Sequence, residues 1–580
     1  MEALSSSFLQ AYSLNHTPSS PSPIFKFKVS SVQIEEKHAK TSHQTPFLPQ
    51  KKHTHSHNPN ITPPKSNQIN KIFTALDNFI TDFVDLPLRP SIDPRRVLSG
   101  NFAPVPELPP AACPAVEGTL PPDLSGSYIR NGPNPQFFPR GPYHMFDGDG
   151  MLHAVTISGG RATFCSRFVK TYKYGLEKEV GSPVILNVFS AFNGLPASLG
   201  RCSVAFARVL LRQYDPRRGV GGANTSLAVI SGKLFALGES DLPYRVKLRG
   251  DGDIVTLGRH EAFGEPYMTM TAHPKTDAET GEVFAFRHSI RAPYLSFFRI
   301  NAEGIKQPEV PIASLNEASL VHDFAITRSY VVFPDPQIVI KPSEIARGRP
   351  PLRIDPAKVP RLGIMPRYAE SDGEMWWVDV PGFNMMHAVN AWEEEDDGGD
   401  TVVVVASNVQ PVEHVLDRMD LIHSSMERVE INVRDKSVRR RAVAAGNLDF
   451  AVINPAYVGK KNRYVYAAIG APMPKIGGVA KIDLSLSTKG SGDCTVASRL
   501  YPPGCYGGEP FFVAREADNP AAAEDDGYLV TYLHDENSEE SKFIVMDANS
   551  PNLDVIAAVK LPGRVPYGFH GIFVHHNTNS

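Results

Sequence analysis

The sequence predicts an all-β fold built from repeated hairpins, and three observations lead to this prediction. Short runs rich in β-branched and aromatic residues recur between clusters of Gly, Pro, Asn and Asp, at 234–237, 283–287, 330–333, 401–406, 464–469 and 528–532. Two segments, 464–484 and 527–547, each hold two such runs joined by a short turn, which is the pattern of a hairpin. Helices of matching length do not alternate with these runs. Hairpins repeated in this way favour radial repetition, as in a β-propeller, over one oversized sandwich.

Residues 1–68 differ in composition from the rest of the chain and predict a cleavable extension. They hold twelve Ser, six His and seven Lys against three Glu, with scattered Pro and no hydrophobic periodicity. A Ser-rich segment with few acids is typical of an organelle transit peptide, whereas the lack of Arg before Arg89 fits a mitochondrial presequence poorly. We therefore expect a chloroplast transit peptide and disordered extension at 1–68. The alternative is a tail that is merely disordered.

Residues 69–110 are predicted to form an amphipathic helix and an extended lead-in. Bulky apolar residues occur at helical spacing over 70–84, at Ile72, Phe73, Leu76, Phe79, Ile80 and Phe83. The other helix face carries acids such as Asp77 and Asp82 rather than lysines, so attraction to anionic lipid cannot add to apolar burial. Two interpretations stay open, a helix in a lipid interface and a helix packed on the main body. Seven prolines between 85 and 110 exclude a continuous helix there.

The main domain is predicted to span 111–580 as a β-propeller with a helical insertion around 188–214. Apolar residues are frequent in this insertion, for example Phe189, Phe192 and Leu199. Their surface is expected either to line a hydrophobic tunnel or touch membrane, or to pack over one end of the sheet assembly. The acidic run at 393–397, which two glycines follow, predicts a solvated turn.

The overall composition excludes several classes of partner. The chain of 580 residues has a formal net charge of -3, and its basic cluster at 439–441 is too short to form a nucleic-acid groove. Nucleic acid is therefore not expected as a partner. Five cysteines without a C-x-x-C pair predict neither a disulfide scaffold nor a thiolate zinc site, which suits a reducing compartment. The longest apolar run, at 402–406, is far shorter than the roughly 20 residues that cross a bilayer.

Candidate chemistry rests on histidines, because the sequence has no H-E-x-x-H, G-x-S-x-G or P-loop motif. Of nineteen histidines, six lie in 1–68, and four of the others stand in loop-like contexts: His273, His322, His387 and His570. These four are 49, 65 and 183 residues apart, which matches no local zinc motif. In a propeller each could come from a different blade and meet the others on the axis. A single histidine of this kind is more often structural than a ligand, so spacing alone does not define a site.

Several motifs around these histidines resemble those of plant carotenoid cleavage dioxygenases. In chain order they are Arg130-Asn131-Gly132-Pro133-Asn134-Pro135, Phe146-Asp147-Gly148-Asp149-Gly150-Met151, Glu239-Ser240-Asp241-Leu242-Pro243, His322-Asp323-Phe324, Gly507-Gly508-Glu509-Pro510 and Pro566-Tyr567-Gly568-Phe569-His570-Gly571. The likeness runs from about 70 to 574. Within the family, the segments 447–455 and 471–475 are most similar to the plastid type-four carotenoid cleavage dioxygenases. The related 9-cis-epoxycarotenoid dioxygenases are a poorer match.

The resemblance implies a seven-bladed β-propeller with a helical dome over the iron-containing face. It also implies an Fe(2+) ion with four ligands, His273, His322, His387 and His570. Four neutral imidazoles would leave two octahedral positions open, one of which can take O2. The family holds its ligand imidazoles with carboxylates, and Glu239 and Glu509 match two of these by motif. At the third position stands Asp449, where the 9-cis-epoxycarotenoid group has Glu. Its shorter side chain is expected to reach its histidine directly or through water.

The implied reaction cleaves a conjugated double bond of a carotenoid or apocarotenoid into two carbonyl products, with iron and O2 and no reductant. Cleavage at 9,10 (9′,10′) is expected, since type-four relatives commonly cut there. Phe569 matches a family aromatic that lines the cavity at the iron. Met386 stands where relatives carry Phe, and its softer side chain is expected to widen the slot. The alternatives are 11,12 cleavage of a 9-cis-epoxycarotenoid and a carotenoid-binding propeller with poor turnover.

A polyene substrate is insoluble, which bears on the location of the protein. The resemblance gives weight to the helix at 70–84 and to the apolar insertion as a dock on thylakoid or plastoglobule lipid. The expected location is therefore the plastid, in peripheral contact with a membrane or plastoglobule surface. The oligomeric state is not predicted.

Overall fold

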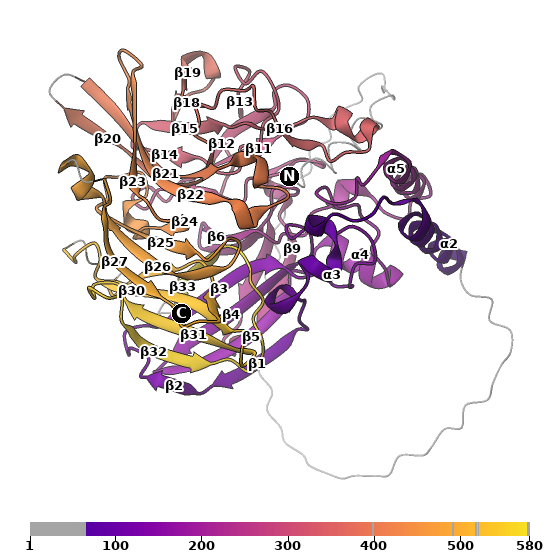
Figure 1. Ribbon diagram of the computed structural model, residues 1–580, viewed down its shortest axis with the longest axis horizontal. Coiled ribbons are helices and arrows are strands. Elements are labelled where there is room, and N and C mark those ends of the chain that lie inside the picture. Colours follow the sequence, from indigo (N-terminus) through magenta and orange to yellow (C-terminus); the bar gives the residue numbers. More distant parts are fainter. Residues whose placement is uncertain (1–64, 397–398, 490–491, 517–518, 520, 577–580) are drawn as a thin grey trace, which may run out of the picture.

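The computed structural model describes residues 65–576 apart from 397–398, 490–491, 517–518 and 520. The described chain is mostly β-structure, as the sequence predicts. Figure 1 shows its sheets packed side by side, with the larger helices gathered along one flank. Residues 1–64 of the predicted extension lie outside the described residues.

Several sheets contain strands that follow one another in the chain and pair antiparallel. One holds β6 (Ser226–Ile230), β7 (Lys233–Leu237), β8 (Tyr244–Leu248) and β9 (Ile254–Arg259). The next holds β10 (Lys275–Thr276), β11 (Val283–His288), β12 (Leu295–Ile300) and β13 (Val310–Pro311). A third holds β14 (Ala325–Ile326), β15 (Tyr330–Asp335), β18 (Arg361–Pro366) and β19 (Trp376–Asp379), while β16 (Ile338–Ile340) pairs with β17 (Leu352–Ile354). Another holds β20 (Met385–Asp396), β21 (Gly399–Gln410), β22 (His423–Asn432) and β23 (Val438–Ala444).

The remaining strands join segments that are distant in the chain. One sheet contains β1 (Leu108–Cys113), β3 (Gly126–Pro133), β4 (Gly150–Ser158), β5 (Arg161–Phe168) and β33 (Gly571–His575). The largest sheet contains β2 (Ala115–Gly118), β24 (Leu448–Val452), β25 (Tyr464–Gly470), β26 (Ile476–Asp483), β27 (Thr495–Leu500), β28 (Cys505–Gly507), β29 (Phe511–Ala514), β30 (Gly527–Asp535), β31 (Glu540–Asp547) and β32 (Val555–Lys560). Both hairpins predicted from the sequence are confirmed, as β25–β26 and β30–β31.

Hydrophobic cores lie between neighbouring sheets and continue around the assembly. Strands β6 and β7 share a core with β11 and β12, which share another with β15 and β18. The succession continues through β20–β22, then β25 and β26, then β29–β31. From β30–β32 it reaches β3–β5, and these strands share a core with β6–β8. The sheets therefore form a closed ring in which most strands are covered on both faces.

The two ends of the described chain close this ring. Strand β3 pairs with β33, with Arg130 opposite Gly571, and β2 pairs with β32, with Ala115 opposite Val559. Each pairing joins residues more than 440 positions apart. Local periodicity carries no information about such contacts, so the closure could not be read from the strand pattern.

The amphipathic helix expected over 70–84 is present as α2 (Lys65–Phe79), continued by one π-helical turn, η1 (Ile80–Val84). It begins four residues before the expected boundary at 69, because the polar residues 65–68 carry no hydrophobic pattern that marks a start. Phe73 and Ile80 are buried against the body, whereas Ile72, Leu76, Phe79 and Phe83 are exposed. The helix is therefore packed on the protein and also presents an apolar surface.

The acids of this helix are neutralised by arginines, which the sequence pattern did not reveal. An oxygen of Asp77 lies 2.6 Å from a guanidinium nitrogen of Arg208, and Asp85 pairs with Arg201. Both arginines belong to α5 (Leu195–Leu210), which packs beside α2 in Figure 1. Because the acids are paired within the protein, they add little net negative charge to the exposed apolar surface.

Short helical turns interrupt the proline-rich lead-in, which is thus less extended than expected. They are η2 (Pro90–Ile92), α3 (Pro94–Val97) and η3 (Gly100–Phe102). Pro90 and Pro94 stand at the first position of their turns, where a missing N–H does no harm. Asp93 caps α3 by accepting a hydrogen bond from the backbone N–H of Arg95 at 3.0 Å.

The expected insertion at 188–214 contains α5, and its first residues are not helical. A further helix, α4 (Tyr172–Val180), was missed because its nine residues have no clear apolar periodicity. Its ends carry recognisable signals, since the side chain of Thr171 accepts a hydrogen bond from the N–H of Tyr174 and Gly181 adopts φ +78°.

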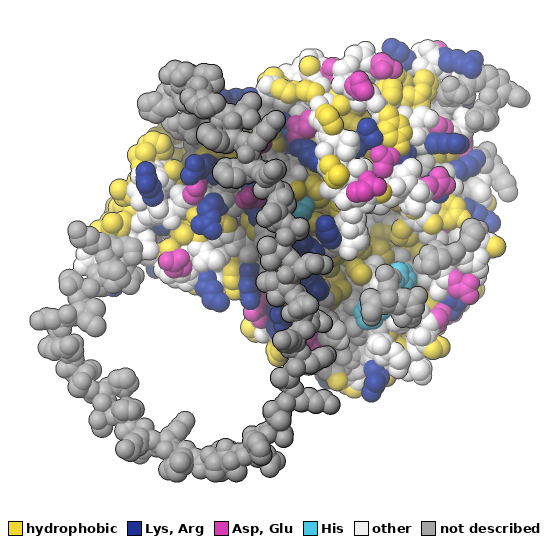
Figure 2. Space-filling view, turned by 180° about the vertical axis from the view of Figure 1, so that it is seen from behind, with side chains coloured by type: hydrophobic (Ala, Val, Ile, Leu, Met, Phe, Trp, Pro, Cys, Tyr) yellow, Lys and Arg dark blue, Asp and Glu magenta, His cyan; other side chains and the backbone are white. Residues whose placement is uncertain are grey.

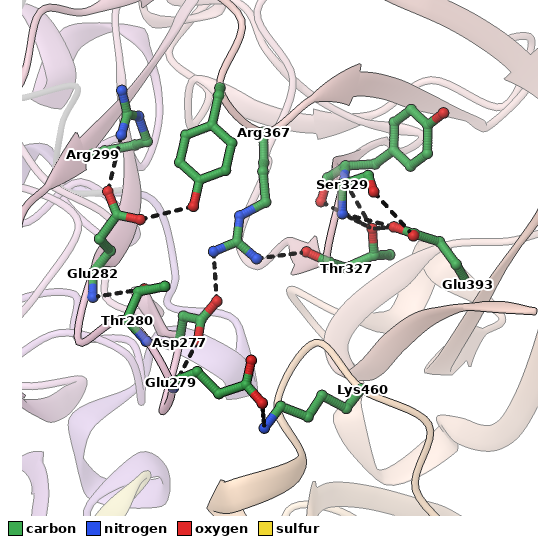
Figure 3. A network of polar contacts seen from close by, with 12 residues as sticks. Asp277, Glu279, Thr280, Glu282, Arg299, Thr327, Ser329, Arg367, Glu393 and Lys460 are labelled. Atoms are coloured by element: carbon green, nitrogen blue, oxygen red, sulfur yellow. Dashed lines mark hydrogen bonds and ion pairs between the residues drawn. The ribbon is translucent and has the colours of Figure 1, made fainter.

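The acidic run at 393–397 is not a solvated turn as far as the structure describes it, because Glu393 to Asp396 belong to β20. Figure 3 shows the carboxylate of Glu393 turned toward Thr327 and Ser329. It accepts hydrogen bonds from the Ser329 N–H at 2.7 Å and from the Ser329 hydroxyl at 3.0 Å. These donors come from the segment between β14 and β15 of a neighbouring sheet, so Glu393 stabilises the contact between the two sheets.

The outer surface shows no single sign of charge. Acidic and basic side chains are mixed with hydrophobic ones over the face in Figure 2. None of the helices in the described part of the chain has the length and hydropathy that a bilayer crossing needs. All five cysteines are free thiols.

Candidate functional site

Four histidines from four different sheets meet inside the ring. His273 precedes β10, His322 precedes β14, His387 lies in β20 and His570 precedes β33. One ring nitrogen of each lies within 4.8 Å of the corresponding nitrogens of the other three. The Nε2 atoms of His273 and His322 are 3.1 Å apart. The structure thus brings together the four histidines that the sequence singled out.

The strand that carries His387 departs from regular pairing at this point. Met385 lies opposite Asn408, but Ala388 lies opposite Ala406, so β20 has a bulge between these two positions. A bulge of this kind re-aims a side chain away from the regular alternation of a strand. The bulge explains how the side chain of His387 points from β20 toward the other three imidazole rings.

Three of the rings are held by buried carboxylates on the side away from the cluster. Glu239, which follows β7, accepts the Nδ1–H of His322. Asp449 in β24 accepts the Nδ1–H of His387 at 2.9 Å, and Glu509 between β28 and β29 accepts that of His570 at 2.9 Å. Each bond fixes the tautomer that leaves the Nε2 lone pair free toward the cluster. These are the three carboxylates that the sequence motifs singled out, and Asp449 reaches its histidine directly.

The electrostatics reflect burial and these pairings. Burial acts to raise the pKa of Glu239 and of Asp449, but the charge and hydrogen bond of the paired imidazole outweigh it and lower both pKa values. Burial acts to lower the pKa of His387, and Asp449 outweighs it so that this pKa is raised. Burial, together with the other three histidines, holds the pKa of His273 well below its usual value. Among the described residues no carboxylate lies within 4.0 Å of the His273 ring.

Asp323 links three of the histidine segments and was not recognised from the sequence as a functional residue. Its carboxylate pairs with Lys275 at 2.7 Å and accepts the backbone N–H of Ala388 at 2.8 Å. Lys275 follows His273 by two residues, Asp323 follows His322, and Ala388 follows His387. The signal was present, since Asp323 belongs to a quoted motif, but its long-range partners were not visible in the sequence.

A narrow apolar cavity of about 120 Å³ adjoins the cluster. His322, His387 and His570 form part of its wall, and Phe569 and Met386 line it as expected. Phe189, from the insertion that the sequence analysis considered as a tunnel lining, also lines it. Other lining residues were not singled out from the sequence, namely Phe146, Phe450, Val409, Val415, Met419, Ile422 and Met473. The ring centroids of Phe146 and Phe569 are 5.8 Å apart, so the aromatic wall is continuous beside His570.

Phe450 is the most unusual of these lining residues. Its φ of +49° lies in the left-handed region, which is uncommon for a bulky side chain. Its ring centroid lies 5.2 Å from that of His387 and 5.5 Å from that of His570. Strained backbone of this kind occurs at functional sites that the surrounding structure over-determines.

The narrow cavity adjoins wider ones. Met419 also lines a cavity of about 640 Å³ whose wall includes Arg96, Lys475 and Arg564. Phe189 also lines a cavity of about 730 Å³ that reaches Leu195 at the start of α5. The two wider cavities share His144, Leu416 and Asp417 in their walls, so they lie next to each other, and each has one lining residue in common with the slot beside the histidines.

The chemistry of the donor set is that of a transition-metal site. Neutral imidazole nitrogens suit first-row divalent ions, and four of them within reach of one another could hold a single ion. The absence of a carboxylate or thiolate from the four donors leaves the charge of such an ion uncompensated within its first coordination sphere.

Comparisons with known proteins agree with this geometry. Residues 102–575 match the family model RPE65, retinal pigment epithelial membrane protein. Over 526 residues the chain is 56% identical to the probable carotenoid cleavage dioxygenase 4, chloroplastic, of Arabidopsis thaliana, covering 90% of this chain and 88% of that protein. It is 54% identical over 509 residues to the 9-cis-epoxycarotenoid dioxygenase NCED1, chloroplastic, of Oryza sativa subsp. japonica, covering 86% of this chain and 79% of that protein.

Solved structures share the architecture. Cobalt-substituted Synechocystis ACO, an apocarotenoid oxygenase, aligns with a TM-score of 0.67 at 25% identity, covering 84% of this chain and 100% of that chain. The lignostilbene dioxygenase of Pseudomonas brassicacearum aligns with a TM-score of 0.70 at 21% identity, covering 85% of this chain and 100% of that chain, which shows the fold alone.

Proposed function

The chain belongs to the RPE65 and carotenoid cleavage dioxygenase family and is a dioxygenase of that family; on this premise we propose that it uses Fe(2+) and O2 to cleave a carotenoid or apocarotenoid at the 9,10 (9′,10′) double bond. The observation that carries the proposal is the convergence of His273, His322, His387 and His570 beside an apolar slot. An apolar slot suits a polyene, and a four-imidazole site suits an ion that activates O2.

The residues of the site fit ferrous iron as the bound ion. Three Nδ1–H groups are already used by Glu239, Asp449 and Glu509, so three Nε2 lone pairs are available without rearrangement. In this proposal His273 supplies the fourth nitrogen, and its lowered pKa keeps it neutral at physiological pH. Four donors leave room for further ligands in an octahedral sphere.

In the proposed reaction one C=C bond breaks and each of its carbons receives one oxygen atom, so O2 and the polyene balance without a reductant. Ferrous iron, when bound, supplies the activation of O2 that this reaction requires. The protein's own residues position the polyene and exclude water. Phe189, Phe146 and Phe569 form an aromatic wall, in which the centroid of Phe146 lies 5.3 Å from that of Phe189 and 5.8 Å from that of Phe569.

The shape of the slot supports a long, thin substrate. A volume of about 120 Å³ holds only a short part of a polyene, and the neighbouring spaces of about 640 and 730 Å³ provide room for the part of the chain that extends beyond the slot. We propose that Met386 and Phe569 select which double bond stops beside the histidines.

We further propose that the ring has seven blades under a helical dome. The ten-stranded sheet is divided into two blades where β26 and β28 meet through one residue pair, Ile476 and Gly507. With that division, and with the two-stranded β16–β17 sheet counted apart from the ring, the strands fall into seven groups linked by the successive cores. The dome would consist of α2 to α5, and Leu195 at the start of α5 lines the wider cavity beside the slot.

The proposed location is the plastid, in contact with thylakoid or plastoglobule lipid. The relatives in Arabidopsis and rice are named chloroplastic, and a Crocus sativus relative, 56% identical over 364 residues, is named chromoplastic. The exposed apolar side chains of α2 and η1, together with Leu199 and Leu210 of α5, provide a surface that can dip into lipid. Residues 1–68 would serve as the transit peptide, with the dioxygenase domain beginning near 111.

A second candidate is 11,12 cleavage of a 9-cis-epoxycarotenoid. The specific observation in its favour is 54% identity to a rice 9-cis-epoxycarotenoid dioxygenase, nearly the same as to the type-four relative. Both candidates use the same histidines and differ in where the polyene stops along the slot.

The experiment that tests the proposal is product analysis in carotenoid-accumulating bacteria that express the chain from Lys65 onward, which keeps α2 intact. A variant with His322→Ala serves as the control. A thirteen-carbon ketone that the control does not produce supports cleavage at 9,10. Carbonyl products of another length would show that a different double bond is cleaved. Unchanged pigment with soluble, folded protein contradicts carotenoid cleavage and leaves an apocarotenoid as the substrate to try.

A further inference from the structure

Arg130 is an exception among the buried arginines of the described chain. Five arginines are less than 9% exposed, and four of them form ion pairs with carboxylates: Arg201, Arg208, Arg367 and Arg428. Arg130 is 2% exposed, and among the described residues no carboxylate lies within 4.0 Å of its guanidinium. Burying a charge without a partner costs free energy, so we expect Arg130 to have a role that offsets this cost.

The guanidinium of Arg130 is instead held by a backbone loop and a ring. Its Nη2 donates a hydrogen bond to the carbonyl oxygen of Pro566, and the cation lies 5.2 Å from the centroid of Tyr532. The Nε–H has no hydrogen-bond partner within the described residues. Pro566 lies four residues before His570 in the loop 561–570 that joins β32 to β33, so the contact holds this loop near the histidine.

Two glycines leave the space that Arg130 occupies. A Cβ at Gly568 would lie 2.8 Å from Nε and 3.0 Å from Cζ of Arg130, and a Cβ at Gly508 would lie 3.4 Å from Nη1. Gly568 stands two residues before His570, and Gly508 stands directly before Glu509. The guanidinium is therefore wedged between the segment that carries a histidine of the cluster and the segment that carries the carboxylate holding that histidine.

The segments that carry the other three histidines are held together by a different residue. Asp323 ties together the segments of His273, His322 and His387 through Lys275 and the N–H of Ala388. Among the described residues it forms no hydrogen bond or ion pair with the segment of His570.

The segment of His570 is held by backbone pairing to β3 and by Glu509. It is also held by hydrogen bonds from the Tyr567 N–H to the Asn101 carbonyl, from the Tyr567 hydroxyl to Glu536 and from the His570 N–H to the Thr225 carbonyl. Arg130 adds a contact that lies between this segment and the one that carries Glu509.

We propose that Arg130 is a positioning residue for the metal centre, holding the loop of His570 against Glu509 so that the Nε2 atom of His570 is aimed at the ion. This inference rests on the proposed function in assuming that the four histidines bind one ion. It assigns to Gly508 and Gly568 the role of admitting the guanidinium. Mutation of the groups that hold the metal ligands typically changes metal affinity by about 10–100-fold. Arg130 contacts the segments that carry such groups and not a ligand itself, so we expect a change in affinity of about tenfold.

The test measures Co(2+) binding to the folded protein freed of metal, by calorimetry and by the visible absorption of the bound ion. Arg130→Met is expected to weaken Co(2+) binding about tenfold and to change the absorption band, because one imidazole is misaimed. Gly568→Ala, which pushes a methyl group against the guanidinium, is expected to do the same and takes the place of Arg130→Met if that variant does not fold.

Arg367→Met is the matched control. Arg367 is equally buried, donates to the carbonyl of Thr327 at 2.9 Å and lies 4.4 Å from the centroid of Phe284, but its ion pair with Asp277 stands at the far end of β10 from His273. Its loss is expected to lower the melting temperature without changing Co(2+) affinity. Unchanged affinity and spectrum in folded Arg130→Met or Gly568→Ala would overturn the inference. Failure of the parent protein to bind Co(2+) would instead overturn the proposed metal centre, and this inference with it.

Discussion

The carboxylate of Asp449 lies 2.9 Å from Nδ1 of His387, close enough for a direct hydrogen bond although its side chain is one methylene shorter than the glutamates at the two equivalent positions. The backbone conformation compensates for the shorter side chain. Phe450 adopts φ +49°, and the same oxygen of Asp449 also accepts the N–H of Phe450 at 2.8 Å. The turn holds the carboxylate toward the imidazole and fixes its rotamer.

Asp449→Asn is expected to lower metal affinity by about 10–100-fold, because the amide lacks the charge that strengthens the bond to His387. Iron content after purification and the dissociation constant for Co(2+) measure the effect. Asp483→Asn, which removes a carboxylate paired with Arg463 away from the cluster, is the control. Equal dissociation constants in the two variants would contradict a role of Asp449 in the metal centre.

Met386→Phe is expected to change the ratio of cleavage products, since a larger, stiffer side chain beside His387 narrows the slot. Chromatography of products from one C40 carotenoid measures the ratio. Met386→Leu conserves the volume and is expected to keep the parent profile. If all three proteins give the same profile, Met386 does not determine the position of the cut.

Replacing both Phe79 and Phe83 with Ser is expected to weaken binding to liposomes, because these side chains are 56% and 76% exposed and contribute apolar area outside the protein. Flotation of the protein with vesicles of plastid-like lipid measures the binding. Ile305→Ser removes a side chain of similar exposure from a distant loop and should leave flotation unchanged. Undiminished flotation of the double variant would mean that the lipid-binding surface lies elsewhere on the protein.

Deleting the whole helix is a poorer experiment than these substitutions. The deletion of 72–84 would uncover the sites filled by Phe73 and Ile80 and leave Arg208 without its partner Asp77. An arginine left buried and unpaired is strongly destabilising. A change in solubility after such a deletion would report the damage as well as the loss of lipid contact.

His144 is expected to make the protein less stable as the pH falls. Its Nε2–H donates to the carbonyl of Leu416 at 3.0 Å and its Nδ1 accepts the N–H of Phe146 at 3.2 Å, so the buried ring is neutral. Burial lowers its pKa from 6.5 to about 4. Between those values the unfolded chain binds a proton that the folded protein does not, so stability rises with pH in this window and is lost as pH falls.

From pH 7 to pH 5 this linkage amounts to about 2 kcal/mol of unfolding free energy. His144→Gln removes the titrating group, so urea unfolding at the two pH values should show a smaller loss for this variant than for the parent. Parallel losses in both proteins would mean that His144 is not the group responsible.

Local pattern and family motifs predicted different parts of the molecule. Alternation within a few residues was sufficient for the hairpins β25–β26 and β30–β31, because both strands and their turn are contiguous. The histidines and their carboxylates came from motifs rather than from spacing. Asp323 and Arg130 lay in those motifs too, but their partners are distant in sequence, and only the folded chain shows what they hold.

The failures have equally specific causes. The run at 393–396 is acidic enough to suggest a turn, yet β20 includes it because Ser329 and Thr327 supply donors from a neighbouring sheet. The left-handed backbone of Phe450 has no sequence signal, since glycine or asparagine would be expected there. The first departure arises from a contact between sheets, which no local rule anticipates.

The pairing of β3 with β33 also sets the order in which the protein can become active during its synthesis. His570 is the last of the four histidines to leave the ribosome, and its loop is anchored by strands made more than 400 residues earlier. A nascent chain released before residue 570 would hold three of the imidazoles and would lack β33, so the ring would stay open. Metal loading of the proposed centre is therefore expected to follow translation, and a stop before His570 is expected to abolish the centre while leaving most of the sheets able to form.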